Sequence, residues 1–540
     1  MKEIQEKFIS NPDVCYKITG VNIFVQLISE INNGTFVGTS RPLTKQRKTS
    51  SSFKDASLKE IFLTTTSGLN SLYSSLPLSQ SQADYLIALF NLAKACLTFD
   101  YLGNGNDESQ EETTVHLPTS WREIIVNGEI FNNFIKWYDK GLPGTMTSPL
   151  MTCIAQIASI RRTVFSANER TDHIQRLVSG MIVILENPSP LNDADTYHEF
   201  CRFLNRIKAS YQLNELVNIA EYKKWMECII KFTINSVSNG SVSANSLYYV
   251  LTFWQKMACS VPYVRLEKDH FLDKFSSEIC VSYIKTRYQA ISEYSNKNSS
   301  FNNSTNLVGL NPYEEVDQDQ IEQQLEAIAS LARCQYNTVC EQVYEMLVNV
   351  RHQLENPTDT IYQQCSWLIQ VVSSLIGSRV TSLASDKTDS SDAMLIKLTF
   401  EIIQVADSRY GQNGQTFQDS KFELEADDLD EKDLLQLSIV YFFAQFKRIY
   451  IGEQMAKTCP VYVMLNETYN LENESAVLKA LLQKIISNLK YQIACVPVVT
   501  DSIKILNSLS QGYTSARQMA KIEMIKDMLA KGLIDLPLGK

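Results

Sequence analysis

Histidine is scarce in this sequence, and the signatures of several enzyme classes are missing. Five histidines occur among 540 residues. There is no GxxxxGK[ST] phosphate-binding loop, no GxSxG nucleophile motif and no HExxH zinc motif. The spacing of His198 and Cys201 would allow a shared metal ion, but no second pair follows, so packing in the core is the better interpretation. We expect no enzymatic activity, no metal and no cofactor.

Paired cysteines, long apolar runs and an excess of positive charge are also absent. The twelve cysteines stand singly, without a CxxC pair, which is typical of reduced cysteines that pack as small core residues. The N-terminus lacks the apolar segment of a secretory signal, and no run approaches the ~18 apolar residues of a membrane-spanning helix. The formal net charge of −10 argues against general affinity for nucleic acid. We therefore expect a protein of a reducing compartment, with no nucleic acid partner and no membrane insertion.

Turn formers are few, and alternating strand patterns are essentially absent. Instead, apolar residues recur at helical spacing, most clearly over residues 150–187. A first helix is expected at residues 150–165. Ser166 and Glu169 form a capping-box pattern that begins a second helix. That helix should end at Asn187, because Pro188 disfavours helical conformation in the residue before it.

A helical hairpin of this kind cannot bury both of its apolar stripes alone and needs a similar neighbour on each side. The sequence therefore predicts an all-α fold, an α-α superhelix (solenoid) of HEAT-like hairpin repeats. With no strong break in composition, residues 1–540 read as one continuous array. Polar stretches near residues 34–54, 103–117, 295–316 and 411–433 are expected to be mobile loops, because they offer little apolar surface to offset the entropy of ordering.

Two groups of cations are candidates for binding partners. The first is the basic stretch with Arg41, Lys45, Arg47 and Lys48, which would suit a nuclear-localisation-like signal, a partner contact or a solvated loop. The second is Arg161 with Arg162. They would either line the inner face of the solenoid and contact an acidic partner, or be surface charges near a helix C-terminus, where cations suit the helix dipole.

Several stretches are more specific than the repeat pattern. They are RPLTKQRK at 41–48, SWRE at 120–123, IASIRRTVF at 157–165, YHEFCRFL at 197–204, WQKMACSVPYV at 254–264, QFKRIYIG at 445–452 and IISNLKY at 485–491. In this order they resemble the exportin-7 group of importin-β-type (karyopherin) nuclear transport receptors. Members of that group are longer on both sides, so the resemblance implies the middle portion of a receptor.

The resemblance implies a receptor that binds protein cargo together with the GTP form of the small GTPase Ran. It also implies contacts with Phe-Gly nucleoporins and shuttling between nucleus and cytoplasm through nuclear pore complexes. Because the repeats that grip Ran in the family precede this portion, we expect only a weak preference for the GTP form. The alternative is a solenoid scaffold that ignores nucleotide state, and GTP-dependent cargo binding would separate the two.

Overall fold

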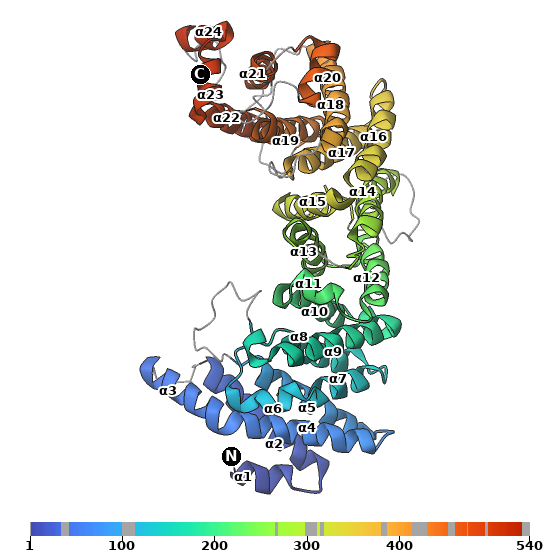
Figure 1. Cartoon of the computed structure of the whole chain (residues 1–540), viewed down its shortest axis with the longest axis vertical. Helices are drawn as coiled ribbons and strands as arrows, with labels where there is room; N and C mark the ends of the chain where they lie inside the picture. The colour runs from blue at the N-terminus through green and yellow to red at the C-terminus, as the bar shows by residue number, and fades with distance from the viewer. Residues whose placement is uncertain are drawn as a thin grey trace. The chain divides into compact units, whose positions relative to one another are not determined.

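The computed structural model in Figure 1 is built from α-helices. It describes residues 2–33, 43–99, 114–264, 268–297, 310–313, 318–379, 386–412, 429–451, 459–471, 474–491 and 495–531. Within those ranges, extended pairing is limited to an isolated parallel bridge between Val115 and Ile160. The expected all-α class is therefore confirmed, and so is the succession of packed helices.

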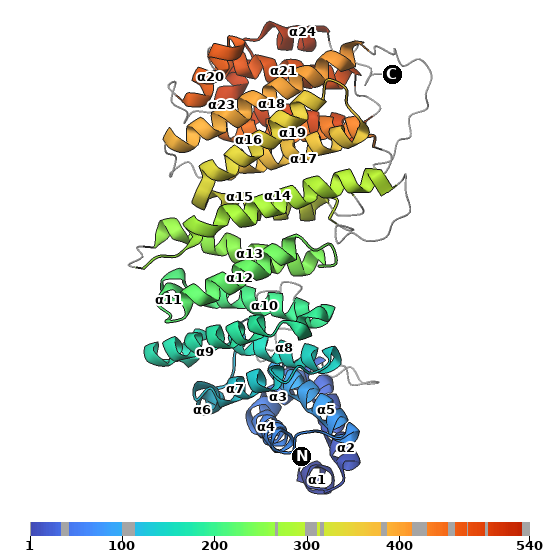
Figure 2. The same cartoon turned by 90° about the vertical axis from the view of Figure 1, so that its right-hand side faces the viewer.

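The described helices fall into two compact units, residues 1–236 with 242–271 and residues 237–241 with 272–540. Unit 1 contains α1 (Lys2–Ile4), α2 (Val14–Asn33), α3 (Leu43–Phe53), α4 (Lys59–Ser74), α5 (Gln80–Leu97), α6 (Arg122–Val126), α7 (Glu129–Tyr138), α8 (Gly144–Ala158), α9 (Ala167–Glu186), α10 (Ala194–Ser210), α11 (Leu213–Val217), α12 (Tyr222–Val237) and α13 (Ala244–Ser260). Helices α2, α5, α8, α10 and α13 pack in succession as one layer, and α4, α7 and α9 form a second layer beside it. In the turned view of Figure 2, the helices of this unit lie one above another.

Unit 2 repeats this two-layer plan. It contains α14 (Leu272–Lys297), α15 (Gln318–Ala332), α16 (Tyr336–Gln353), α17 (Asp359–Gly377), α18 (Asp386–Gln412), α19 (Glu431–Tyr450), α20 (Pro460–Tyr469), α21 (Glu474–Tyr491), α22 (Val496–Gln511), α23 (Tyr513–Met519) and α24 (Glu523–Lys531). Helices α15, α17, α19 and α22 make one layer, and α16, α18 and α20 make the other. The five tryptophans of the chain are buried in these two stacks.

The best-patterned unit of the sequence was predicted correctly in its second half and wrongly in its first. Helix α9 begins with the expected capping box of Ser166 and Glu169, and its last residue is Glu186, with the expected end residue Asn187 as its C-cap. Helix α8, expected at residues 150–165, runs instead from Gly144 to Ala158. The chain leaves the helix because Val115 donates to the Ser159 carbonyl at 2.8 Å and accepts from the Arg161 amide at 3.0 Å. Helix α8 has neighbours on both sides, α5 and α10, as the repeat argument requires.

Of the expected loops, the first is corrected where the structure describes it, because residues 43–53 form α3 and residues 54–58 continue as a π-helical segment. Its earlier part, residues 34–42, lies outside the described residues, as do most of the other three stretches. In the third stretch, Leu310 and Asn311 are buried. Helix α18 extends to Gln412 and α19 begins at Glu431, so both ends of the fourth stretch are helical.

Helix α2 is the one described helix with the length and composition of a membrane-crossing segment, over Val14–Asn32 at a mean hydropathy of 1.2. Core helices of water-soluble proteins meet the same criterion. Here α2 packs against α5 and buries Val21, Phe24 and Ile28, while 28% of the apolar window is buried.

Candidate binding sites

Arg161 and Arg162 lie in the turn between α8 and α9, and both are exposed. The turn is fixed through its backbone. The Arg161 amide donates to the Val115 carbonyl, and residues Arg162–Val164 form a single 3-10 turn. The side chains are therefore presented by a rigid segment.

The Arg161 side chain lies beside a histidine of the segment that pairs with the turn. Its Nη1 is 3.4 Å from Nδ1 of His116. Partial burial lowers the pKa of His116, and the Arg161 cation lowers it further. This imidazole is therefore biased toward its neutral form, and the positive charge next to it belongs to Arg161.

Arg122 supports the same turn from α6. Its Nε donates to the Val164 carbonyl at 3.2 Å, and its Nη2 lies 2.7 and 2.6 Å from the two carboxylate oxygens of Glu169. The pKa of Glu169 is lowered first by the Ser166 amide of the capping box and then by the Ser166 hydroxyl, and the Arg122 guanidinium contributes in the same direction. The turn is thus tied to the start of α9.

A pocket of about 450 Å³ opens next to this turn. It is lined by Arg162, Thr163, Phe165, Arg170, Gln212, Asn214 and Glu215. Phe165 is stacked on the imidazole of His173, with ring centroids 4.4 Å apart and planes 19° apart. His173 is buried, and burial lowers its pKa to about 4, so the ring behind Phe165 is neutral at physiological pH.

The other predicted cations lie on a different element. Lys45 and Lys48 are exposed on α3, which packs against α2. Arg47 belongs to the same helix, and Arg41 lies outside the described residues. The structure therefore places Lys45 and Lys48 on α3, as its basic face, and Arg161 and Arg162 on the turn between α8 and α9.

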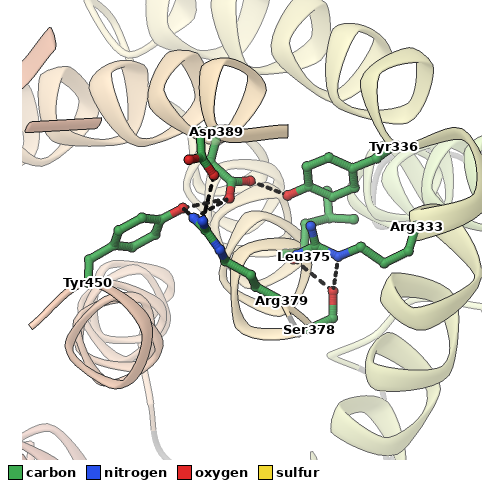
Figure 3. Close-up of polar contacts among 8 residues, drawn as sticks. Arg333, Tyr336, Leu375, Ser378, Arg379, Asp389 and Tyr450 are labelled. Carbon is green, nitrogen blue, oxygen red and sulfur yellow. Dashed lines mark hydrogen bonds and ion pairs between the residues drawn. The ribbon is translucent and has the colours of Figure 1, made fainter. Parts of the chain in front are cut away.

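Unit 2 contains a polar cluster that the sequence did not reveal (Figure 3). Arg379, just after α17, pairs with Asp389 of α18 at 2.7 Å and donates to the Tyr450 hydroxyl at 3.0 Å. Tyr450 donates to one oxygen of Asp392 at 2.5 Å, and Tyr336 donates to the other. Burial raises the pKa of Asp392, while the neighbouring cations and hydroxyl groups act in the opposite direction.

The same cluster closes the C-terminal end of α17, where backbone carbonyls lack helical partners. Arg333 donates to the Leu375 carbonyl at 2.6 Å and to the Ser378 hydroxyl at 3.0 Å. Arg448 of α19 donates to the Gly377 carbonyl at 2.7 Å. Since Asp392 is fully buried and the Arg379 side chain is 8% exposed, the cluster holds the stack together and offers little surface to a partner.

A second pocket, of about 530 Å³, lies between α15, α17 and α19 and is acidic. Among its lining residues are Asp319, Glu322 and Glu326 of α15, with Tyr441 and Arg448 of α19. The pKa of Glu322 is raised by burial and then by the nearby carboxylates of Asp319 and Asp501. Each unit thus carries a polar pocket on its helical stack, and the two differ in charge.

Similarity to curated proteins covers nearly the whole chain, and similarity to a family model covers its second half. Residues 311–533 match the family model described as Exportin-7-like, TPR domain. The chain is 34% identical over 95% of its length to Exportin-7-B of Xenopus laevis, covering 45% of that protein. It is 32% identical to Ran-binding protein 17 of Homo sapiens, with the same coverages of 95% and 45%. Exportin-7 of Dictyostelium discoideum is 26% identical over 94% of the chain and 48% of that protein. The chain therefore spans about half the length of the curated relatives it matches.

Proposed function

We propose that this chain is an exportin-like nuclear transport receptor or a part of one, because it is similar to exportin-7 proteins along almost its whole length. The observation that carries the proposal is this extended similarity, which covers both helical units and not a single repeat. The relatives are named for export and for Ran binding, and none of these names describes a reaction. The proposed activity is binding.

The proposal includes specific binding partners and a localisation in the cell. The chain binds protein cargo on the surface of its stacked helices, together with the GTP form of Ran. It contacts Phe-Gly nucleoporins and shuttles between nucleus and cytoplasm through nuclear pores. Stacked helical repeats support this because they present an extended surface on which many side chains contribute to one interface. We also propose that the two units continue one array of repeats, with Arg161, Arg162 and the basic face of α3 among its partner contacts.

The test measures how this chain and Exportin-7-B bind Ran in its GTP and GDP forms, with and without a cargo-containing extract. Preference for the GTP form that increases with cargo supports a receptor. By linkage, cargo must then raise the affinity for Ran by the same factor as Ran raises the affinity for cargo. If Exportin-7-B prefers the GTP form strongly and this chain prefers it only weakly, the chain is a part of a receptor.

The second candidate is a scaffold that holds other proteins and ignores nucleotide state. It is supported by the packed helices of both units, because stacked helices present a binding surface to a scaffold's partners as well as to a receptor's cargo. Equal binding of both Ran forms, or of neither, by the chain and by Exportin-7-B would support the scaffold and contradict the receptor.

A further inference from the structure

The turn between α8 and α9 and the start of α11 enclose a pocket whose charge is opposite to that of the whole chain. The pocket holds about 450 Å³ and is lined by residues from three segments: Arg162, Thr163 and Phe165 of the turn, Arg170 of α9, and Gln212, Asn214 and Glu215 at α11. The chain as a whole carries a formal net charge of −10. The positive charge of the pocket is therefore a local feature of an acidic chain.

The acidic groups at this place are already neutralised. One oxygen of Glu215 lies 2.8 Å from Nε of Arg170, and the other accepts from the Gln212 amide at 2.9 Å. Glu169 is held by Arg122 in the same manner on the other side of the turn. Two arginines for two glutamates leave no net charge from these pairs.

The remaining charge comes from Arg161 and Arg162. Arg161 faces the neutral-biased ring of His116. In the described part of the chain, the side chain of Arg162 makes no ion pair or hydrogen bond, although it is exposed and lines the pocket. Its guanidinium therefore has all of its N–H donors available to a ligand.

The pocket is also held in shape before any ligand arrives. The backbone of the turn is fixed to Val115, and Phe165 is stacked on the buried His173. Thr163, Gln212 and Asn214 add neutral polar groups around the guanidinium. Binding at such a site does not carry the entropic cost of ordering a loop.

We propose that this pocket binds a carboxylate side chain of an acidic peptide segment in a protein partner, with Arg162 as the principal contact. A planar guanidinium and a carboxylate match in a bidentate arrangement, which is stronger and more directional than a contact with a single ammonium. Nucleic acid fits less well, because its binding depends on many cations that follow the phosphate backbone. At this turn two cations, Arg161 and Arg162, have no carboxylate partner among the described residues. The inference rests on the proposed partner contact at Arg161 and Arg162 and specifies its chemistry. The peptide test below involves neither Ran nor transport, so the failure of either proposal can be told from the failure of the other.

The experiment measures fluorescence anisotropy of a labelled poly-glutamate peptide with the full chain, at low and at physiological salt. The variants are Arg162→Glu and Arg162→Lys. The matched control is Lys231→Glu, which makes the same charge change at an exposed lysine of α12 that does not line the pocket. Circular dichroism checks that each variant keeps its helical content.

We expect Arg162→Glu to weaken poly-glutamate binding at least about tenfold and Lys231→Glu to leave it within about twofold. Arg162→Lys should give an intermediate loss, because a lysine retains the charge and lacks the fork of donors. Equal affinity in Arg162→Glu and the unchanged chain, or equal loss in the Lys231→Glu control, would overturn the proposal.

Two further arms identify the source of the anion. A phosphoserine peptide of the same length separates carboxylate from phosphate recognition, and a single-stranded DNA oligonucleotide tests the nucleic acid alternative. We expect the phosphoserine peptide and the oligonucleotide to bind more weakly than poly-glutamate. Tighter binding of either, lost in Arg162→Glu, would assign the pocket to that ligand and overturn the carboxylate.

Discussion

Arginines follow two helices of equivalent position, α8 in unit 1 and α17 in unit 2, and their surroundings differ completely. Arg161 and Arg162 after α8 are exposed, and no carboxylate reaches Arg162 among the described residues. Arg379 after α17 has a side chain that is 8% exposed and contacts Asp389, Asp392 and Tyr450. Cations near the C-terminal end of a helix suit the dipole in both cases. The two turns differ in whether the next helix contributes carboxylates that pair with the arginine.

The comparison shows that position in a repeat does not decide whether an arginine is structural. Helix α18 contributes two carboxylates one turn apart, and these convert Arg379 into part of the core. The corresponding acid in unit 1, Glu169, is taken by Arg122. An arginine left over in this way is available for partners.

The largest expected effect is on Arg379. Replacing it with alanine removes the guanidinium that pairs with Asp389 and Asp392, and breaking a buried ion pair in this way costs roughly 3–5 kcal/mol of stability. Urea unfolding followed by circular dichroism should show the shift. Arg162→Ala is the control, with a change within about 0.5 kcal/mol. Similar shifts in both variants would remove the contrast between the two turns.

A smaller effect is expected from His173, which lies beneath the exposed turn. Its pKa is lowered to about 4 in the folded chain, against about 6.5 in an unfolded one. Between these values the unfolded chain takes up a proton that the folded chain does not, so stability is present above about pH 6.5 and is lost as the pH falls toward about 4. At pH 5 the loss from this group amounts to about 2 kcal/mol.

The measurement compares the urea midpoint at pH 8 and pH 5 in the unchanged chain and in His173→Phe, which keeps a flat ring against Phe165. The variant should lose less stability on acidification. The same pH dependence in both chains would show that the turn of unit 1 does not rest on a neutral histidine.

The pair of Arg122 and Glu169 should contribute less again. Its side chains are 46% and 27% exposed, so solvent screens the attraction despite the short contacts. We expect Arg122→Ala to cost less than about 1 kcal/mol, and raising the salt concentration to reduce the difference from the unchanged chain. A loss as large as that of Arg379→Ala would mean that exposed and buried pairs contribute equally here.

The smallest effect on folding is expected from the double substitution Arg161→Glu with Arg162→Glu. Both side chains are exposed, so the helical content should be unchanged and the free energy of unfolding should stay within about 0.5 kcal/mol of the original, while binding of an acidic partner weakens. Unchanged binding would return these residues to the role of surface charges near a helix end.

Much of the fold could be predicted from the sequence, because periodicity records which side chains are buried along one helix. Helix α9 was predicted at both ends from Ser166, Glu169 and Pro188. The predicted end of α8 was wrong because Ile160 fits the helical period. In the structure, the backbone around Ile160 pairs with Val115, which is far away in sequence. Periodicity contains no information on such a pairing.

The candidate sites were predictable only in part, for the same reason. Arg161 and Arg162 stand out as adjacent charges, and their role in binding remains a prediction. The pocket beside them needs Gln212 and Glu215 from a later helix, and the cluster around Arg379 needs Asp392 and Tyr450. Asp389 and Asp392 stand three residues apart near the start of α18, which is a weak signal that only the packed structure makes specific.

The buried cluster in unit 2 also affects how the stack comes apart. In an array whose repeats contact only their neighbours, unfolding can begin at any seam and spread repeat by repeat. Arg333, Tyr336, Arg379, Asp392 and Tyr450 instead connect the junction of α15 and α16, the end of α17, α18 and the end of α19. Unfolding of any one of these helices removes hydrogen-bond or ion-pair partners from the others. Helices α15–α19 should therefore melt as a single cooperative block, and hydrogen exchange along them should share one opening free energy.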